Sequence, residues 1–586
     1  MRLRAALLAA LAVAALSLPA LGNGLAWDDL EFTFARGGRL LSSGLTGDLL
    51  AEASPGHGPS GYYRPVAVAT LAATEALRPG PAAHHAVSVA LHALAAALLL
   101  LLLARRLGAV APALAGALLW ALHPANLEPV AWISGRYDLL TGLLAVAVLL
   151  VPRPAGLGRA LLLGLLFLAG LLSKEGFIAM ALVLLVDDLA SPDVTRADGW
   201  PEAAWRRWVR WLAVALAIAA WLALRRLLSI PPIALPPLPD LPRDLLSGVA
   251  IHLARVVAPW PLSVSHPYAP SWPLAAAGAL TVVALLALAW RRRALATPVA
   301  LLLAPLLPMS LAAARLGEAP ERYLYLPSLG LAWLVGAGLT DAWARGPALR
   351  GATAAAAALL LVFFGASWWT RLPDWRSDAT LFGAALRADP GNALGNLALG
   401  SLAAREGRLD EAARLLGIAV ERDPGSVRAV STLAWLHLRR GEVPAALSRA
   451  RQAVALAPGY PLARLHLSGA LHLSGDHAGE LQAAGAALAL SPGYREARLT
   501  RTLARCEVTP DPGCEADLDA MEREGRLNGV DALVARAEAA IRRRDPAAAQ
   551  ERVERLAAAA PQDPRTRLLG AAAARLGQAP GAGPKR

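Results

Sequence analysis

A period of 34 residues in the C-terminal half limits the fold of this chain more than any other feature. An X-Pro-Gly turn recurs there at Asp389-Pro390-Gly391, Asp423-Pro424-Gly425, Ala457-Pro458-Gly459 and Ser491-Pro492-Gly493. A glycine and a leucine keep the same spacing, at Gly407, Gly441 and Gly475 and at Leu399, Leu433 and Leu467. Because a unit of this length cannot bury its apolar face alone, neighbouring units must stack. The period therefore predicts an α-solenoid.

The details of the period are typical of the tetratricopeptide repeat, which has two helices, a small residue at the inner turn and a proline that ends the second helix. We assign residues 373–576 to this domain, with 374–390 as a lone leading helix and 525–561 as a degenerate further pair. Residues 577–586 predict a disordered tail. Such solenoids present a concave groove, so we expect a protein or peptide there, either an acceptor or a partner in an assembly.

Residues 1–372 predict a polytopic membrane domain. Hydrophobic residues make up 56% of the sequence and charged residues 17%, against about 25% charged residues in soluble proteins. The excess lies in long blocks that need lipid or one another to cover them. Eleven blocks are candidate spans, near 4–22, 84–104, 109–122, 138–151, 160–172, 176–188, 211–229, 273–290, 297–314, 325–342 and 351–369. The whole chain is therefore expected to be all-α.

Arginine clusters at the ends of these blocks set the expected orientation. The formal net charge of +13 is not read as a nucleic-acid surface, because the arginines lie where topology signals lie. A cytoplasmic N-terminus puts the clusters on one side and places residues 23–83 and everything after about residue 370 outside. This predicts a multi-pass protein of the plasma (inner) membrane with extracytoplasmic repeats. Residues 247–262 are then a re-entrant or interfacial segment.

Two features leave alternatives open. Residues 1–22 have the basic start and apolar middle of a signal peptide, although an uncleaved first span is favoured. Cys506 and Cys514 are the only cysteines, which excludes a disulfide scaffold and a multi-cysteine zinc site. A single disulfide between them remains an option if that region lies outside the cytoplasm.

Ionisable residues collect at the outer ends of the predicted spans, where polar groups are expensive. Asp28 and Asp29 follow the first span directly, after Trp27. One of two adjacent carboxylates can act as a base or a metal ligand while the other orients it. A solvated acidic pair at a helix start is the alternative, but the position and the aromatic neighbour favour a functional pair.

Lysine is rare in this chain, which has only Lys174 and Lys585. Lys174 stands beside Glu175 at the end of a predicted span, so a compact ammonium occurs where arginine is the usual choice. An interfacial snorkelling pair is the alternative. Arg322 lies outside, against the positive-inside trend, and an anionic ligand such as a lipid phosphate explains that position better than a topology anchor does.

The order of these segments resembles that of a known family. The acid pair is followed by YYRP at 62–65, HPANLEPVAWISGRYDLL at 123–140, LLSKEG at 171–176 and ERYLYLPSLG at 321–330, and then by the repeats. Over nearly the whole chain, this order resembles the transmembrane and tetratricopeptide-repeat-containing O-mannosyltransferases and their bacterial relatives, which have the GT-C glycosyltransferase fold. The resemblance implies transfer of a hexose, with mannose as a candidate, from a polyprenyl-phosphate donor to a protein or glycan hydroxyl on the outer face.

The resemblance also implies roles for particular residues. Asp28 or Asp29 would be the catalytic base that takes the acceptor proton. Arg322, Lys174 and Arg136 would bind the donor phosphate. The residues expected to shape the pocket are His123, Glu128, Glu175, Tyr63, Arg64, Glu321 and Tyr323. This division is chemically sensible, because phosphate departure needs a fixed cation and hydroxyl attack needs a nearby carboxylate. The alternative for His123, Glu128 and Arg136 is a cluster that only holds a loop.

The expected ligands are membrane lipid and a lipid-linked sugar, with no nucleic acid. An Asp-Asp pair can hold a divalent ion, but no further carboxylate at ligand spacing demands one, so we assign no metal ligands and leave metal dependence open. The family's eukaryotic members carry longer repeat arrays, so acceptor choice is not transferred. The rival interpretations are a non-enzymatic membrane scaffold for an envelope complex and a transporter, although transporters favour midplane charges and internal repeats.

Overall fold

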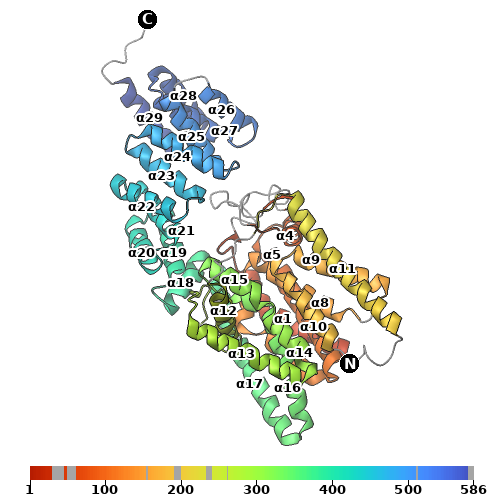
Figure 1. Cartoon of the computed structure of the whole chain (residues 1–586). Helices are drawn as coiled ribbons and strands as arrows, with labels where there is room; N and C mark the ends of the chain where they lie inside the picture. The colour runs from red at the N-terminus through yellow and green to blue at the C-terminus, as the bar shows by residue number, and fades with distance from the viewer. Residues whose placement is uncertain are drawn as a thin grey trace. The chain divides into compact units, whose positions relative to one another are not determined.

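A computed structural model of the chain describes residues 1–29, 45–48, 61–152, 156–190, 200–232, 240–260, 262–509 and 513–578. The described part is helical, with one isolated β-bridge between Pro267 and Glu318 and no longer strand (Figure 1). This confirms the all-α prediction. The described residues form two compact units, one within residues 1–399 and one from residue 400 onward. We call them the membrane unit and the repeat array.

The membrane unit is built from helices of very different length. Its helices are α1 (Arg2–Ser17), α4 (Pro65–Leu77), α5 (Pro81–Leu107), α6 (Val110–Ala121), α7 (Leu127–Ala131), α8 (Arg136–Leu150), α9 (Leu157–Leu171), α10 (Met180–Ala190), α11 (Trp200–Leu227), α12 (Leu241–Val257), α13 (Trp272–Arg291), α14 (Ala296–Leu303), α15 (Leu306–Leu316), α16 (Pro327–Ala344), α17 (Pro347–Arg371) and α18 (Asp378–Ala388). Helix α5 packs against α1, α6 and α8, while α12 packs against α13 and α15.

The ends of α5 show how the sequence sets these helices. Pro81 occupies the first turn, where its missing N–H costs nothing. Arg105 and Arg106 lie in the last turn, where their charges complement the helix dipole. Gly108 then takes φ 71°, the left-handed conformation that ends a helix. The helix is long enough, at 27 residues, to cross a bilayer.

Several long helices expose apolar side chains. Leu280 and Trp290 on α13, Leu359 and Val362 on α17, and Leu216 on α11 all lie at the surface. Faces of this kind are covered by lipid in a membrane protein. Seven helices of the described residues are long and apolar enough to span, or eight if the bent pair Val110–Ala121 and Pro124–Ala131 forms one broken span.

The predicted count of eleven spans is not reproduced by this criterion. Every predicted block is helical, but α6, α9 and α10 have only 12, 15 and 11 residues. They fall short of the roughly 20 residues that cross the hydrocarbon core. The number of spans stays a prediction. Residues 247–262, expected to be re-entrant or interfacial, lie largely in helix α12, which is not among the spanning candidates.

The membrane unit continues past residue 372, the expected domain boundary. Trp375, Leu381, Phe382 and Leu394 share one hydrophobic core with residues of the membrane helices. The leading helix expected at 374–390 is α18, and Ser377 and Thr380 cap its first turn reciprocally. This helix therefore packs as part of the membrane unit.

The repeat array consists of helical hairpins in chain order (Figure 1). The pairs are α19 (Ala393–Arg405) with α20 (Leu409–Arg422), α21 (Val427–Arg439) with α22 (Val443–Leu456), α23 (Pro461–Leu473) with α24 (His477–Leu490), α25 (Arg495–Val508) with α26 (Gly513–Arg523), and α27 (Gly529–Arg542) with α28 (Pro546–Ala559), followed by α29 (Pro564–Gly577). The first half of α19, up to Leu399, belongs to the membrane unit. Gly407, Gly441 and Gly475 have φ of 82°, 72° and 82°. Glycine recurs at these inner turns because they require a left-handed residue.

The two cysteines are joined. Cys506 near the end of α25 and Cys514 at the start of α26 form a disulfide that links these two helices. Both side chains belong to a small buried core with Leu518 and Met521. The predicted disordered tail from residue 577 lies outside the described residues beyond residue 578. Residues 30–44 and 49–60 of the predicted outer loop at 23–83 also lie outside them.

Candidate functional site

Asp29 is built into the fold. One of its carboxylate oxygens accepts hydrogen bonds from the backbone N–H and the hydroxyl of Ser134, at 2.9 and 2.8 Å. The other accepts from the backbone N–H of Ala26 at 3.1 Å. The residue is 1% exposed. Burial raises its pKa to about 6, although these hydrogen bonds act in the opposite direction. Asp29 is therefore an anchor between the segment that follows α1 and the turn before α8.

Asp28 differs from its neighbour in exposure. It is half-buried, whereas Asp29 is fully buried. Both carboxylates lie close enough to the Tyr137 side chain to act on it electrostatically. The two acids that sequence reasoning treated as interchangeable are thus distinct in their exposure to solvent.

Arg322 lies beside two stacked aromatic rings and against a buried acid. Its guanidinium carbon is 5.1 Å from the ring centres of both Trp27 and Trp132, and these two rings stack at 5.1 Å. Glu128 accepts from the Arg322 side chain at 2.6 Å and from its backbone N–H at 2.9 Å. Burial opposes the charge, but Glu128 outweighs it and holds the pKa of Arg322 above its usual range. The result is a fixed cation with 17% of its side chain exposed.

Trp27 adopts an unusual conformation to reach this position. Its φ is 58°, a region that residues other than glycine rarely occupy. Its backbone N–H donates to Asp378 at 2.6 Å, and Phe382 packs edge-on against its ring at 6.1 Å. Residues held in such conformations cluster at functional sites. The acid pair and Arg322 are thus linked through one strained residue.

Lys174 is paired with Asp138, the last polar residue of the 123–138 segment. Its ammonium donates to one oxygen of Asp138, and the other oxygen of that carboxylate is buried without a hydrogen bond. The Tyr323 ring lies 5.4 Å from the ammonium. Burial lowers the pKa of Lys174, with Asp138 acting against that effect. Sequence reasoning assigned no role to Asp138, although its distance from Lys174 in the chain is only 36 residues.

Arg64 and Glu175 make a third pair. Glu175 accepts from Arg64 at 3.1 and 2.9 Å and from the backbone N–H of Tyr63 at 3.1 Å. The Arg64 guanidinium carbon lies 4.4 Å from the Tyr62 ring centre and 4.9 Å from that of Tyr137. The Tyr63 hydroxyl donates to the carbonyl of Leu45 at 3.1 Å, away from these rings.

These pairs form one connected group. Lys174 interacts electrostatically with both Arg64 and Arg322, and Tyr323 contacts both Lys174 and Arg322. We define the cation cluster as the six paired residues and their aromatic neighbour: Arg64, Glu175, Lys174, Asp138, Arg322, Glu128 and Tyr323. Its members come from four separate segments, which sequence reasoning assigned to a common face. Its three cations are each paired with an acid, and Arg322 keeps 17% of its side chain exposed.

Arg136 and His123 lie apart from this surface. Arg136 is fully buried and donates to the carbonyls of Thr70 and His84 and to the hydroxyl of Thr74, at 2.8 to 3.1 Å. It therefore ties α4 and α5 to α8. His123 interacts with the Val256 carbonyl at 2.9 Å and accepts from the Ala125 N–H at 3.3 Å. Both residues serve the fold in this structure, and a role in ligand binding stays a prediction.

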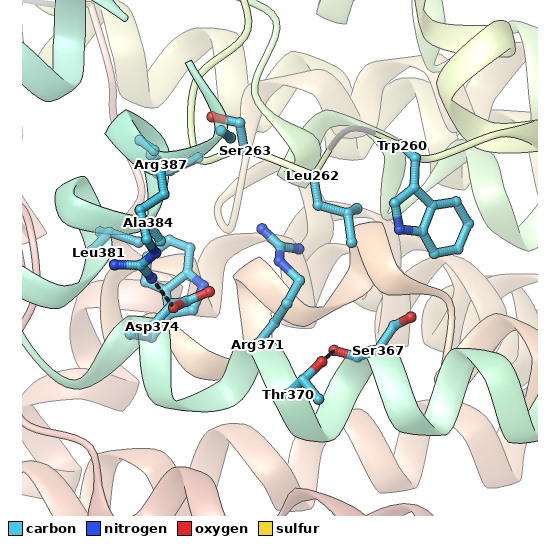
Figure 2. Close-up of a pocket in the computed structure, with 14 residues that line it drawn as sticks. Trp260, Leu262, Ser263, Ser367, Thr370, Arg371, Asp374, Leu381, Ala384 and Arg387 are labelled. Carbon is cyan, nitrogen blue, oxygen red and sulfur yellow. Dashed lines mark hydrogen bonds and ion pairs between the residues drawn. The ribbon is translucent and has the colours of Figure 1, made fainter. Parts of the chain in front are cut away.

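Glu321 leads to a pocket that sequence reasoning missed. It pairs with Arg371 at 2.9 Å and accepts from the Ser263 N–H at 2.8 Å. Burial raises its pKa, but Arg371 and His266 more than offset this, so the pKa lies below its usual range. Figure 2 shows Arg371 directed toward the 262–263 segment, with the ion-paired Arg387 and Asp374 on one side and Trp260 on the other. The pocket has a volume of about 380 Å³. Arg371 could have been singled out from the sequence, because this cation lies two residues after the last predicted span at 351–369.

Comparisons with known proteins give a short match. No protein-family model matches the chain. A 92-residue stretch is 35% identical to "Protein O-mannosyl-transferase Tmtc2" of Drosophila melanogaster, covering 16% of this chain and 10% of that protein. A 95-residue stretch is 37% identical to "Protein O-mannosyl-transferase Tmtc1" of the same organism, covering 16% and 11%. The chain thus matches about a tenth of the length of these relatives.

Solved structures resemble the repeats. They include TTC0263, a thermophilic TPR protein of Thermus thermophilus, at 24% identity and a TM-score of 0.27, covering 31% of this chain and 99% of that one. YrrB, a TPR protein with an unusual peptide-binding site, is 15% identical with a TM-score of 0.25, covering 33% and 97%. The repeat architecture itself rests on the hairpins and turn glycines described above.

Proposed function

We propose that this chain is a membrane glycosyltransferase that moves a hexose from a polyprenyl-phosphate donor to a protein or glycan hydroxyl. The acceptor hydroxyl attacks the anomeric carbon, and its proton passes to Asp28. The bond between that carbon and the phosphate oxygen breaks, so polyprenyl phosphate leaves with the electron pair. No nucleotide sugar takes part in this step.

The observation that carries the proposal is that Arg322 packs against the ring of Trp27, the residue directly before Asp28. A leaving phosphate needs a cation that is already in place, and Arg322 is held by Glu128 and by two indole rings. Trp27, which directly precedes Asp28, is one of these two rings. The chain therefore brings a fixed cation and a half-buried carboxylate to the same short segment.

The other charged residues of the site have supporting roles in this proposal. All three cations are paired with an acid, so a phosphate would compete with Glu128 for Arg322, while Lys174 and Arg64 add to the local potential. Asp29 holds the backbone that positions Asp28, since its oxygens already accept three hydrogen bonds. Metal dependence is tested in the same experiment.

Mannose is the hexose we propose, on the support of the short matches to two proteins named O-mannosyl-transferases. We also propose an inner-membrane location with the cation cluster and the repeats on the extracytoplasmic side. The disulfide between Cys506 and Cys514 supports an oxidising compartment for the repeats. The repeat array would recruit a protein acceptor or partner.

The test is transfer of labelled mannose from a polyprenyl-phosphate donor to endogenous protein in membranes that hold the full chain. Asp28→Asn should lower transfer by about 10²- to 10⁴-fold, the usual contribution of a general base. Arg322→Ala should lower it by about 10²- to 10³-fold. Asp341→Asn is the matched control, because Asp341 is an exposed acid of the same unit, paired with Arg292. A parallel reaction with a chelator tests for a metal.

The second candidate is a membrane-anchored scaffold, which the repeat array favours by itself. If the chain is only a scaffold, membranes that hold it should show no sugar transfer with glucose, galactose or mannose donors. It would also show a cellular phenotype that survives Asp28→Asn and Arg322→Ala but requires the repeats. That combination would overturn the enzyme proposal.

A further inference from the structure

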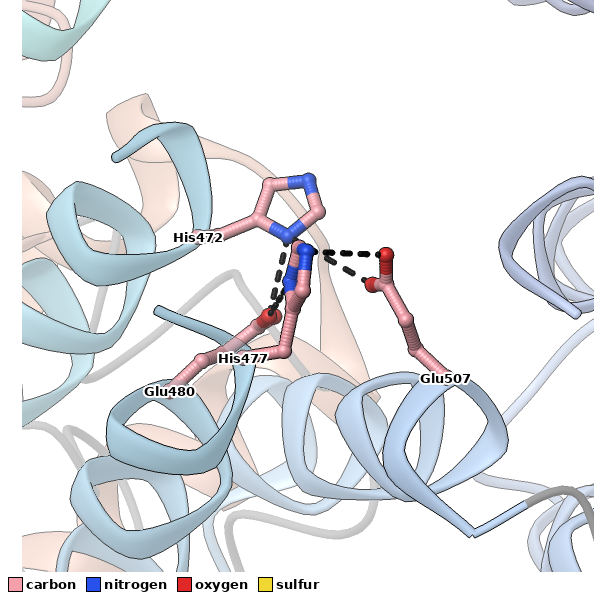
Figure 3. A group of neighbouring side chains, drawn as sticks. All are labelled: His472, His477, Glu480 and Glu507. Carbon is pink, nitrogen blue, oxygen red and sulfur yellow. Dashed lines mark hydrogen bonds and ion pairs between the residues drawn. The ribbon is translucent and has the colours of Figure 1, made fainter. Parts of the chain in front are cut away.

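A group of two histidines and two glutamates lies in the repeat array, far along the chain from the cation cluster (Figure 3). His472 is in the last turn of α23, while His477 and Glu480 are in the first turn of α24. Glu507 comes from α25, the first helix of the next hairpin. One ligand atom from each of the four lies within 4.8 Å of the others. Three consecutive helices therefore meet at this group.

The distances are those of ligands gathered around a common point. The Nδ1 atom of His472 is 2.9 Å from Glu480 and 3.9 Å from Glu507. His477 is 3.8 Å from Glu480 through Nδ1 and 3.2 Å from Glu507 through Nε2. Ligand atoms around a tetrahedral zinc ion with bonds of about 2.0 Å are separated by about 3.3 Å. Figure 3 shows both rings placed between the two carboxylates.

The repeat register shows that the hairpin does not need these residues. The positions 34 residues earlier hold Leu438, Val443, Ala446 and Leu473. Ala446 is fully buried, as is Ala412 one further repeat earlier, so this position normally carries a small apolar side chain. Glu480 replaces that alanine and is itself only 1% exposed. Burying a carboxylate there is costly unless something compensates its charge.

The compensation within the chain is incomplete. Arg542 donates to one oxygen of Glu480 at 2.8 Å and lies 3.7 Å from Glu507. The Nδ1 atom of His477 and one carboxylate oxygen of Glu507 are buried without a hydrogen bond. Two acids thus face one arginine and two histidines, and two polar atoms inside the group remain available to a ligand.

We propose that these four residues bind one zinc ion. Imidazole nitrogen and carboxylate oxygen suit zinc, and four protein ligands make a closed, structural site. The second oxygen of Glu480 stays with Arg542, which would orient the ligating carboxylate. The thiols of Cys506 and Cys514 are engaged in their disulfide and supply no ligand. The ion would join the α23–α24 hairpin to α25 and fix the spacing of two repeats.

The test uses the full chain in detergent, without a histidine tag and with the disulfide intact. After chelator treatment, zinc is added back, and bound zinc per chain is measured by mass spectrometry and by titration calorimetry. Cobalt is a second probe, because a tetrahedral cobalt site absorbs visible light. We expect one zinc per chain, and loss of that zinc and of the cobalt absorption in His472→Gln/His477→Gln.

A matched control comes from the preceding repeat. His437 and Glu442 form a pair at 2.6 Å, and among the described residues they belong to no group of three or more metal-ligating side chains, so His437→Gln should keep the zinc. Glu480→Ala restores the residue of the earlier repeats and should fold while losing zinc. The proposal is overturned if the unaltered chain takes up no stoichiometric zinc after chelator treatment, or if His472→Gln/His477→Gln binds as much zinc as the unaltered chain. The group would then be an ion-pair network only.

Discussion

The ion pairs of the cation cluster lie beneath the surface, whereas most pairs of the repeat array, apart from Glu480 with Arg542, are partly open to water. Glu128, which holds Arg322, has a side chain only 1% exposed. In the repeats, Arg495 and Asp531 pair with side chains 37% and 21% exposed. Breaking a buried pair leaves a charge without water or partner, while a surface pair is easily replaced by solvent. The comparison separates charges placed at a candidate site from charges that solubilise a scaffold.

Removing one partner of the buried pair should have the largest effect. Glu128→Ala leaves Arg322 without its acid, and we expect a loss of about 3–5 kcal/mol in the free energy of unfolding. Thermal unfolding in detergent micelles measures it, with Asp341→Asn as the exposed control. A loss below about 1 kcal/mol would mean that this buried pair contributes no more to stability than an exposed pair does.

The second largest effect should be the loss of stability as Asp29 ionises with rising pH. Burial raises its pKa from 3.8 to about 6, so the native state holds the proton more tightly than the unfolded chain does. The resulting stabilisation is complete below about pH 4 and is lost as the pH rises through about 6, a difference of about 3 kcal/mol. Unfolding measured from about pH 4 to about pH 7 should show this decline in the unaltered chain. The decline should be absent in Asp29→Asn, and an identical profile in both proteins would contradict the assignment.

Ser134→Ala should have a smaller effect through the same carboxylate. It removes the hydroxyl that donates to Asp29 at 2.8 Å but keeps the backbone donor. We expect a loss of about 2 kcal/mol, the usual size for a hydrogen bond to a charged group. Thermal unfolding at neutral pH provides the measurement, with Ser377→Ala as a control at an exposed helix cap. Equal losses in the two variants would mean that burial adds nothing to this hydrogen bond.

Arg495→Ala in the repeat array should have the smallest effect. Its pair with Asp531 is partly solvated, so the loss should be at most about 1 kcal/mol. Chemical unfolding followed by circular dichroism is the suitable measurement, because the array is rich in helix. A loss as large as that of Glu128→Ala would show that the exposure of an ion pair does not determine its contribution to stability.

The repetitive parts of the fold are predictable because their signals are local. The glycine at 407, 441 and 475 is required by a left-handed turn, and each predicted apolar block is a helix. The span count is harder, since the length of a helix such as α10 depends on where its neighbours interrupt it. Sequence composition does not contain that information.

The site was predictable in its residues but not in their pairing. Arg322 finds Glu128 across 194 positions and Arg64 finds Glu175 across 111, and only the folded chain decides such partners. Asp28 and Asp29 are adjacent, so no pattern distinguishes the anchor from the half-buried acid. The histidine and glutamate group was missed for another reason. Comparing Glu480 with Ala446 in the register would have revealed it from the sequence.

The stacked indoles of Trp27 and Trp132 give this protein a built-in optical signal. Two indoles with centres 5.1 Å apart and an interplanar angle of 22° are in a rigid, asymmetric arrangement, which produces strong near-ultraviolet circular dichroism. Arg322 lies against both rings, so a ligand that draws its guanidinium away would change that spectrum. A difference spectrum against Trp27→Phe would isolate this contribution from the other tryptophans. Occupancy of the membrane unit would then be visible without a label.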